Sequence, residues 1–238
     1  MQNLVNKVAL ITGASKGIGY GIAEALVKQG IKVAITSRSQ ESADEAAKKL
    51  SSLDGEVLAI AADVKDYESQ QKAVEQIIAK WGQIDFLIAN AGVGHFAPID
   101  EIDIKDWNDT IDTNLTGVFY SVKAAIPALK NSEGYIITIS SLAGTNFFPE
   151  ASAYNASKFG LTGFSQAIML DLRKYGIKVT TIMPGSVATH FNEHEPDQNA
   201  DAWKIQPEDI GQMVSDLLHM NPRVLPSKIE VRPTKTSN

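Results

Sequence analysis

The stretch Lys7-Val-Ala-Leu-Ile-Thr-Gly13-Ala-Ser-Lys-Gly17-Ile-Gly19 decides the fold, because it places a glycine-rich turn between a strand and a helix. Its first half is an apolar run without polar alternation, which is typical of a parallel strand buried on both faces. Beyond the turn, apolar residues recur at helical spacing as far as Gly30. Glycines at such a turn allow close backbone approach, and free N–H groups at a helix start attract phosphate. The stretch predicts a phosphate-binding strand–turn–helix unit.

Strand-like and helix-like segments alternate along the rest of the chain with short connections. Strands are predicted at 7–12, 32–37, 57–61, 84–89, 135–139, 177–183 and 228–231, and helices at 18–30, 42–50, 66–81, 105–129, 152–174 and 207–219. This alternation is typical of βαβ units, which build a parallel sheet with helices on both faces. We predict an α/β fold, a Rossmann-type doubly wound parallel sheet of about seven strands, with residues 1–238 forming a single domain.

The composition excludes several kinds of chemistry. The chain has 238 residues, a formal net charge of -6 and no cysteine. Disulfides, thiolate metal ligands and cysteine nucleophiles are therefore excluded. The acidic balance gives no general attraction to nucleic acid or anionic membranes, and no apolar run approaches the roughly 20 residues of a membrane span. We expect a cytoplasmic protein that binds neither nucleic acid nor membrane.

The residues at the predicted strand ends are unusual. In doubly wound folds, ligands bind in a crevice beyond the carboxyl ends of the strands, which share one edge of the sheet. These ends are Thr12-Gly13, Ser37-Arg38, Ala62-Asp63, Asn90-Ala91-Gly92, Ser140-Ser141 and Pro184-Gly185. We expect them to gather in a single crevice.

Tyr154 and Lys158 lie four residues apart, so a helix would place them one turn apart on the same face. An ammonium about 4–6 Å from a phenol, whose ordinary pKa is about 10, favours the phenolate by roughly two to three pKa units. Such a phenol could exchange a proton with a substrate near neutral pH. The pair alone would also fit an ordinary helix face, so its meaning depends on Ser141, which ends a strand at the same crevice.

Two further patterns in the sequence are typical of other kinds of site, a hydrolase nucleophile and a metal centre. Residues Gly13-x-Ser15-x-Gly17 also spell the nucleophile elbow of hydrolases, but that elbow needs earlier strands and an oxyanion loop before it. Here the pattern follows the first strand of the chain. In addition, no histidine lies in a sequence motif typical of the catalytic base of a hydrolase. Histidines and glutamates alternate in 190–195, in a polar loop without other candidate ligands. We predict neither a hydrolase nor a metal site.

Taken together, these features resemble the short-chain dehydrogenase/reductase family, in its compact single-domain branch. Each motif is weak alone, but their order and spacing match over nearly the whole chain. The matching residues are Thr12-Gly13-x3-Gly17-x-Gly19, Asp63, Asn90-Ala91-Gly92, Asn114, Ser141, Tyr154-x3-Lys158 and Pro184-Gly185-x-Val187-x-Thr189. One mild departure is Ala89, where an asparagine often stands before Asn-Ala-Gly.

The resemblance implies four catalytic residues. Tyr154 would be the general acid in carbonyl reduction and the base in alcohol oxidation. Lys158 would hold the nicotinamide ribose and favour the Tyr154 phenolate. Ser141 would hydrogen-bond the substrate oxygen, where charge develops. Asn114 would anchor a water that relays protons to Lys158.

The resemblance also implies a set of residues that bind a dinucleotide. The glycine turn would hold its phosphates, the third and fourth strand ends its adenosine, and the sixth strand end its nicotinamide. The set is Gly13, Ser15, Lys16, Gly17, Ile18, Gly19, Ser37, Arg38, Asp63, Val64, Asn90, Ala91, Gly92, Tyr154, Lys158, Pro184, Gly185, Val187 and Thr189.

The end of the second strand predicts which dinucleotide is used. A carboxylate there would bind the ribose 2′-hydroxyl of NAD and repel the 2′-phosphate of NADP. The position is Ser37, followed by Arg38, and Lys16 lies in the glycine turn. Two cations without a carboxylate fit a phosphate, although such charges also suit a solvated surface. We predict NADP(H).

The substrate pocket should be bounded by 94–96, 147–150 and 186–206. The last segment is polar and irregular, and we expect it to act as a small substrate lid. We predict an NADP(H)-dependent oxidoreductase that interconverts a small carbonyl compound and a secondary alcohol. An acyl thioester reduced by a 3-oxoacyl-[acyl-carrier-protein] reductase is the alternative. Members of that kind often carry arginines where this chain has Ser132 and Tyr175. A non-catalytic NADP-binding regulator is less favoured, because Tyr154 and Lys158 are both present.

Small residues on the Tyr154 helix would let another helix approach it closely. The resemblance implies that this helix and the one at 105–129 pair across a dimer, and that the assembly is a homotetramer or homodimer. The tail from Thr234 to Asn238 is expected to fray.

Overall fold

Seven parallel strands form one sheet in the computed structural model, which describes residues 3–53, 55–197 and 199–236. Their order across the sheet is β3-β2-β1-β4-β5-β6-β7, and every neighbouring pair is parallel. The strands are β1 (Val8–Ile11), β2 (Lys32–Ser37), β3 (Val57–Ala61), β4 (Phe86–Ala89), β5 (Tyr135–Ile139), β6 (Lys178–Pro184) and β7 (Lys228–Val231). The predicted α/β doubly wound sheet is confirmed, with the order reversing between β1 and β4.

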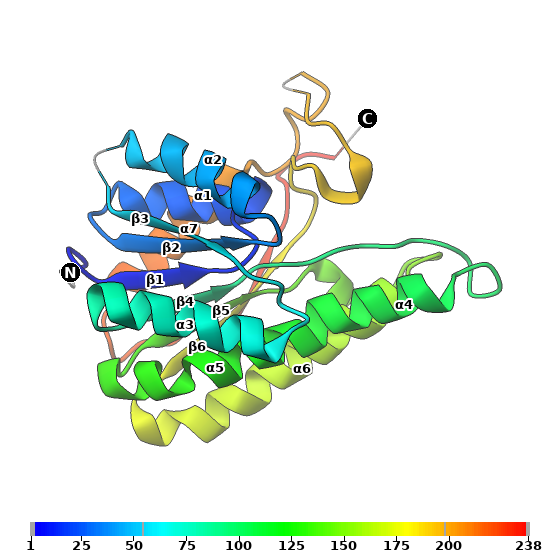
Figure 1. The fold of residues 1–238 in the computed structure, drawn as a ribbon. Coiled ribbons are helices and arrows are strands. Elements are labelled where there is room, and N and C mark those ends of the chain that lie inside the picture. The colour runs from blue at the N-terminus through cyan, green and yellow to red at the C-terminus, as the bar shows by residue number, and fades with distance from the viewer. Residues whose placement is uncertain (1–2, 54, 198, 237–238) are drawn as a thin grey trace.

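Helices cover both faces of the sheet (Figure 1). They are α1 (Gly17–Val27), α2 (Gln40–Ser51), α3 (Tyr67–Trp81), α4 (Ile104–Ile111), α5 (Gly117–Ser132), α6 (Ser152–Leu172) and α7 (Pro207–His219). Helices α1, α2 and α7 lie on one face, and α3, α5 and α6 on the other. None of the described helices combines the length and apolar character that crossing a membrane requires.

The strands alternate their side chains between two apolar cores. In β1, Ala9 and Ile11 pack with the α1, α2 and α7 side, whereas Val8 and Leu10 pack with the α3, α5 and α6 side. All four are almost completely buried. A strand buried on both faces needs no polar alternation, which explains the continuous apolar runs of the sequence.

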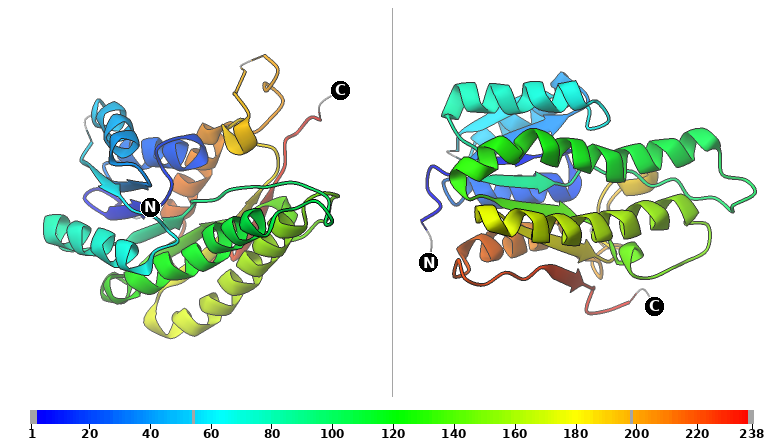
Figure 2. Two further views of the ribbon diagram at one scale, coloured as in Figure 1. Left: turned by 45° about the vertical axis from the view of Figure 1, so that its right-hand side comes forward. Right: turned by 90° about the horizontal axis from the view of Figure 1, so that it is seen from below.

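The helix expected over 105–129 is interrupted, and this corrects the sequence prediction. Helix α4 ends at Ile111, a π-helical turn spans Asp112–Thr116, and α5 then continues from Gly117. Figure 2 shows α4 extending the line of α5 past the sheet, beside α6. A π turn adds one residue to a turn and often occurs at functional sites. It hardly disturbs apolar spacing, so the sequence pattern does not reveal it.

Glycines allow α1 and α7 to pack at very short range. A Cβ on Gly21 of α1 would lie 2.5 Å from the carbonyl oxygen of Pro207. A Cβ on Gly211 of α7 would overlap the carbonyl oxygen of Gly21. By contrast, a Cβ on Gly163 of α6 would meet no atom within 4 Å. The first two positions need glycine for space, and the third does not.

Gly211→Ala should therefore destabilise the protein, whereas Gly163→Ala should stabilise the folded single chain, whose own atoms leave the space beside Gly163 open. Overpacking against backbone costs about 1–3 kcal/mol, while removing glycine from an open helix position gains about 0.5–1 kcal/mol. Urea unfolding of both variants at one protein concentration measures the two changes. Equal shifts of the two midpoints in the same direction would contradict the close packing of α1 on α7.

Candidate active site

A cleft of about 980 Å³ runs along the carboxyl ends of the strands. Every residue of the predicted dinucleotide set lines it except Gly19, and Ser141 lines it too. A Cβ on Gly19 would lie 2.5 Å from Nδ2 of Asn90, so this glycine sits behind the wall, where it permits close packing. The prediction that the strand ends gather in one crevice is thus confirmed by the structure.

The glycine turn forms a cradle joined to the end of β4. Gly13 has a left-handed φ of 62°, and a Cβ there would lie 2.8 Å from Cα of Ala91. Nδ2 of Asn90 donates to the carbonyls of Thr12 (2.9 Å) and Gly13 (3.0 Å). The backbone N–H groups of Asn90 and Ala91 both donate to Oγ1 of Thr12. These contacts fix the floor of the cleft between β1 and β4.

The start of α1 is suited to an anion. Its first turn has no acidic residue, and the N-cap residue Lys16 makes no side-chain hydrogen bond to the helix. The first N–H groups of a helix lack intrahelical partners and attract negative charge. The cradle therefore fits the pyrophosphate of a dinucleotide.

Tyr154 and Lys158 meet Ser141 near the middle of the cleft. Tyr154 lies in the first turn of α6, and Ser141 follows β5. Nζ of Lys158 lies 5.6 Å from the centre of the Tyr154 ring and donates to the carbonyl oxygen of Ile139 at 3.1 Å. Lys158 is only 4% exposed, which is rare for a lysine without a carboxylate partner. The helical spacing thus brings the pair together as the sequence predicted.

The protonation of the pair differs from the expectation. Burial raises the pKa of Tyr154 to about 12, and the neighbouring Ser141 hydroxyl opposes that rise. Burial lowers the pKa of Lys158 to about 8. In the protein alone, the loss of water around the phenol thus outweighs the hydrogen bond with Ser141, and the pKa moves in the direction opposite to that expected from the spacing. At neutral pH the phenol holds its proton, which is the form of a general acid.

Asn114 lies in the π-helical turn, fully buried behind the cleft. Its Oδ1 accepts from the Val93 N–H at 2.8 Å, and its Nδ2 donates to the Val93 carbonyl (2.8 Å) and to Oγ of Ser157 (3.0 Å). The side chain therefore ties the segment after β4 to α6. A Cβ on Gly92 would lie 3.2 Å from Oδ1 of Asn114 and 3.6 Å from Nζ of Lys158. Only the second lone pair of Oδ1 remains for a water.

Three cations stand at the β2–β3 end of the cleft. The sequence singled out Lys16 and Arg38, and both line the cleft. Lys65 also lines it and was missed, although it directly follows the predicted residues at the end of β3. Its Nζ lies 2.7 Å from Oδ1 of Asp109. The hydrogen bond to Asp109 raises the pKa of Lys65, and this effect is larger than the lowering caused by burial or by Arg38. Even with Asp63 at the same end and Asp109 paired with Lys65, the three cations leave an excess of positive charge there.

The chain beyond β7 forms a wall that the sequence did not predict. Residues 234–236, expected to fray, line the cleft through Lys235 and Thr236, and Arg232 and Pro233 join them. The Gly185 N–H donates to the Val231 carbonyl at 2.8 Å, which holds β7 beside the end of β6. The rest of the expected tail, 237–238, lies outside the described residues.

The segment 186–206 has more internal order than its polar sequence indicates. Val187 and Ile205 form a parallel bridge, and Asp201 accepts from His194 and Lys204, each at 2.5 Å. The hydrogen bond from the Lys204 ammonium, and to a lesser extent the one from His194, holds the pKa of Asp201 well below its usual range. A short helical turn carries Phe191. Whether this segment moves as a lid stays a prediction.

A family model described as short chain dehydrogenase matches residues 7–200. An uncharacterised oxidoreductase of Staphylococcus saprophyticus is 36% identical over 98% of this chain and 100% of its own. Trans-4-hydroxycyclohexanecarboxylate dehydrogenase of Sinomonas cyclohexanicum is 37% identical over 79% of this chain and 75% of its own. A 3-oxoacyl-[acyl-carrier-protein] reductase of Synechocystis is 35% identical over 82% of this chain and 79% of its own.

Solved structures agree with the fold. An alcohol dehydrogenase of Thermococcus sibiricus in complex with 5-hydroxy-NADP superposes with a TM-score of 0.92 at 27% identity, covering 98% of both chains. A metagenomic short-chain oxidoreductase in complex with NADP gives 0.86 at 32% identity, covering 99% of this chain and 100% of the other. Carveol dehydrogenase of Mycobacterium avium in complex with NAD gives 0.88 at 25% identity, covering 98% of both. This chain belongs to the short-chain dehydrogenase/reductase family, and it is an oxidoreductase of the kind that uses a nicotinamide cofactor and a small-molecule substrate.

Lys158→Met should stabilise the protein without ligand. The drop of the Lys158 pKa from 10.5 to about 8 corresponds to about 3 kcal/mol of destabilisation below pH 8. Loss of the hydrogen bond to Ile139 lowers the free energy of unfolding of the variant by about 1 kcal/mol. The variant should therefore be more stable than the unmodified protein by about 2 kcal/mol at pH 7.

The gain should shrink as the pH rises. Between pH 8 and 10.5 the unfolded lysine binds a proton that the folded one has released, so the stability of the unmodified protein rises with pH. Urea unfolding from pH 7 to 9.5 should show the two proteins converging. A constant difference would contradict the lowered pKa.

Proposed function

We propose that the protein is an NADP(H)-dependent oxidoreductase that interconverts a carbonyl and a secondary alcohol, with Tyr154 as the general acid and base. The observation that supports this most is the meeting of Tyr154, Ser141 and Lys158 within one cleft that also contains an anion cradle. A buried lysine without a carboxylate partner has no structural purpose that an apolar residue would not serve better. Its position beside the Tyr154 phenol gives Lys158 a chemical purpose, because an ammonium there can stabilise the phenolate.

The residues of the chain divide the work of carbonyl reduction. Ser141 would donate a hydrogen bond to the substrate oxygen, stabilising the negative charge that develops there. Tyr154 would give its phenolic proton to the same oxygen. Its raised pKa keeps that proton in place until the oxygen becomes basic enough to take it. The Lys158 ammonium would stabilise the phenolate left behind.

When bound, NADPH would supply the hydride that adds to the carbonyl carbon. With the Tyr154 proton added to the oxygen, the product would be a neutral secondary alcohol. Tyr154 must then recover a proton. We propose that Lys158 passes one on and is recharged through a water held at the free lone pair of Asn114 Oδ1. In alcohol oxidation the same groups act in reverse.

NADP(H) is proposed over NAD(H) on the charge of the adenosine end. Lys16 and Arg38 flank the end of β2, and Lys65 adds a third cation that Asp109 holds in place. Arginine in particular matches a phosphate group with paired donors. Two of the similar structures are described as complexes with NADP or its 5-hydroxy derivative, and a third with NAD.

A 3-oxoacyl-[acyl-carrier-protein] reductase is the second candidate, supported by the relative of that name. Reductases of that kind often carry an arginine at the position of Ser132. The side chain of Ser132 instead donates a hydrogen bond to the carbonyl oxygen of Ile84 at 2.7 Å. The relative that acts on a hydroxycyclohexanecarboxylate supports a small alcohol or ketone instead. We therefore favour a small carbonyl compound over a carrier-bound acyl chain, and a catalyst over a regulator that only binds NADP.

We also propose that the protein assembles as a homodimer or homotetramer through α4, α5 and α6. Large apolar side chains remain exposed on these helices, which a second copy would cover. They include Ile104, Trp107, Phe119 and Leu170.

Tyr154→Phe should keep NADPH affinity and lose nearly all turnover. Phenylalanine preserves the ring and its packing, but it removes the proton that the substrate oxygen must receive. A loss of about 10²–10⁴-fold in kcat is expected for a missing general acid. NADPH oxidation with ketones and aldehydes measures turnover, and fluorescence titration measures NADPH binding. Tyr175→Phe, outside the cleft, is the control, and turnover retained by Tyr154→Phe would overturn the mechanism.

Arg38→Asp should reverse the cofactor preference from NADPH to NADH. A carboxylate at residue 38, next to the strand-end position Ser37, would repel the 2′-phosphate and could accept a hydrogen bond from a 2′-hydroxyl. A charged hydrogen bond contributes about 1.5–3 kcal/mol, so NADPH affinity should fall roughly tenfold or more. Arg223→Asp makes the same change of charge on an exposed residue outside the cleft and should leave both affinities alone. Equal binding of NADPH and NADH by the unmodified protein would contradict the proposal.

A further inference from the structure

Three phenylalanines form a cluster at the Tyr154 phenol, two of them against its ring and the third against one of those two, and we call them the aromatic cage. They are Phe96 from the segment after β4, Phe148 from the segment after β5, and Phe191 from the segment after β6. The Tyr154 ring centre lies 5.3 Å from that of Phe96 and 5.6 Å from that of Phe191. Phe96 lies 6.1 Å from Phe148 and 6.3 Å from Phe191. Segments distant in the sequence thus converge on one spot.

Gly94 makes room for this arrangement. A Cβ on Gly94 would overlap Cζ of Phe191 and lie 2.8 Å from Cε2 of Phe96. The Phe191 ring therefore rests on the opposite wall of the cleft, in a space that only glycine leaves open. Gly94 does not have a left-handed φ, so alanine would fit its backbone and disturb only the two rings.

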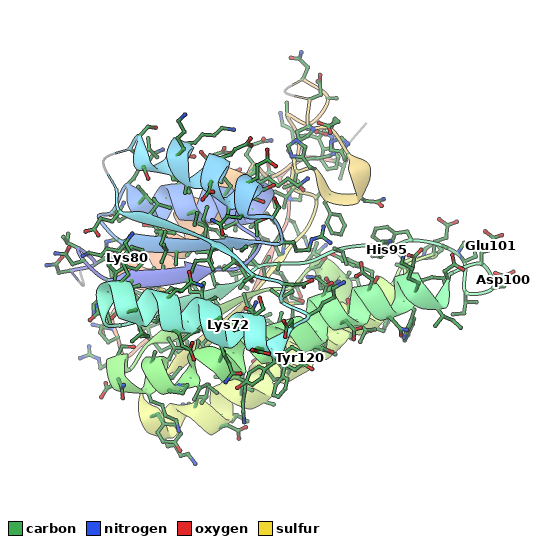
Figure 3. The ribbon with its side chains drawn as sticks, in the orientation of Figure 1. Lys72, Lys80, His95, Asp100, Glu101 and Tyr120 are labelled. Atoms are coloured by element: carbon green, nitrogen blue, oxygen red, sulfur yellow. The ribbon has the colours of Figure 1, made fainter. Side chains whose placement is uncertain are left out.

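Phe96 is held in place from outside the cleft. Its neighbour His95 lies 3.1 Å (Nε2) from Oδ2 of Asp109 on α4. In Figure 3, His95 lies along the part of the loop that runs beside α4, while Asp100 and Glu101 lie at its far tip. The cage wall is thus attached to a helix, whereas the tip of the same loop reaches away from the cleft.

The cage leaves apolar surface uncovered. Phe148 is 45% exposed and Phe191 is 37% exposed, although both line the cleft beside Tyr154. Aromatic rings attract further rings in tilted and edge-to-face arrangements, and the Phe96–Phe191 pair already stands at 72°. A flat apolar group entering between the rings would find both apolar contact and this preferred geometry. An open alkyl chain would find only the contact.

We propose that the aromatic cage binds a flat ring attached to the carbonyl carbon, so that the substrates are aryl ketones and the matching secondary alcohols. Phe191 is then a specificity-determining residue. The choice of substrate class rests on the proposed function, but the binding of the ring by the cage does not. The two can therefore be tested separately.

Ketone binding to the protein saturated with NADP⁺ tests the cage without turnover, because the oxidised cofactor cannot reduce a ketone. Acetophenone and 2-octanone have equal carbon counts and differ in the ring. Calorimetric titration should show acetophenone binding roughly tenfold more tightly, as expected for a shape match in an apolar pocket. Titration without NADP⁺ shows whether the preference is a property of the cage alone.

Two variants and a control assign the preference to the cage. Phe191→Leu should lose roughly tenfold in acetophenone affinity and change 2-octanone affinity far less. Gly94→Ala, which pushes Phe191 away by a different route, should act in the same direction. Phe147→Leu is the control. Phe147 falls in the stretch 147–150 predicted to bound the pocket, but in the structure it stacks on Phe159 at 4.9 Å and does not line the cleft. Thermal unfolding of each variant checks that the fold is kept.

The outcomes separate the cage from the proposed function. Equal affinity of the two ketones, or equal losses for both in Phe191→Leu, would overturn the cage proposal even if NADPH reduces ketones. Ring-selective binding that depends on Phe191 but gives no reduction with NADPH would support the cage and overturn the proposed function. Selective binding with reduction of acetophenone supports both.

Discussion

The hydrogen bonds between Thr12 and Asn90 are the contacts on which the site depends. They join the first and fourth strands where the strand order reverses, and the crevice exists because the chain departs in opposite directions from this point. Thr12 accepts two N–H groups on its side chain and one amide on its carbonyl. Because these hydrogen bonds join the ends of β1 and β4, the glycine cradle and the segment leading to Phe96 both start from fixed positions. The cofactor end and the substrate end are thereby set relative to each other.

The polar groups behind the cleft form a second level of order. Asn114 connects the segment after β4 to Ser157 on the helix that carries Tyr154. Asn155, next to Tyr154, donates to the carbonyls of Ala143 and Asn146, so it holds the segment that follows Ser141. Ser141 and Tyr154, two of the proposed catalytic residues, thus have neighbours whose side chains fix the surrounding backbone. Such support keeps a site within the narrow geometry that chemistry requires.

The fold could be predicted from the sequence because the strands from β1 to β6 are largely apolar runs that end at or just before a small or polar residue, whereas β7 alternates polar and apolar residues. The site could be placed because the carboxyl ends of parallel strands coincide. The π turn around Asn114 was missed, since one extra residue hardly changes helical periodicity. The raised pKa of Tyr154 was missed because spacing gives the neighbouring charge and not the loss of water around it. Arg232 and Lys235 follow the last strand with no pattern of their own, so nothing in the sequence placed them at the cleft.

The wall formed by residues 232–236 has a consequence for the order in which the protein is made. Synthesis runs from the N-terminus, and the cradle and the adenosine end are complete once residue 92 has emerged. The reacting phenol follows some sixty residues later, and the far wall of the cleft only after β7 has joined the sheet. The residues of the cradle are therefore synthesised before any residue of the far wall of the cleft.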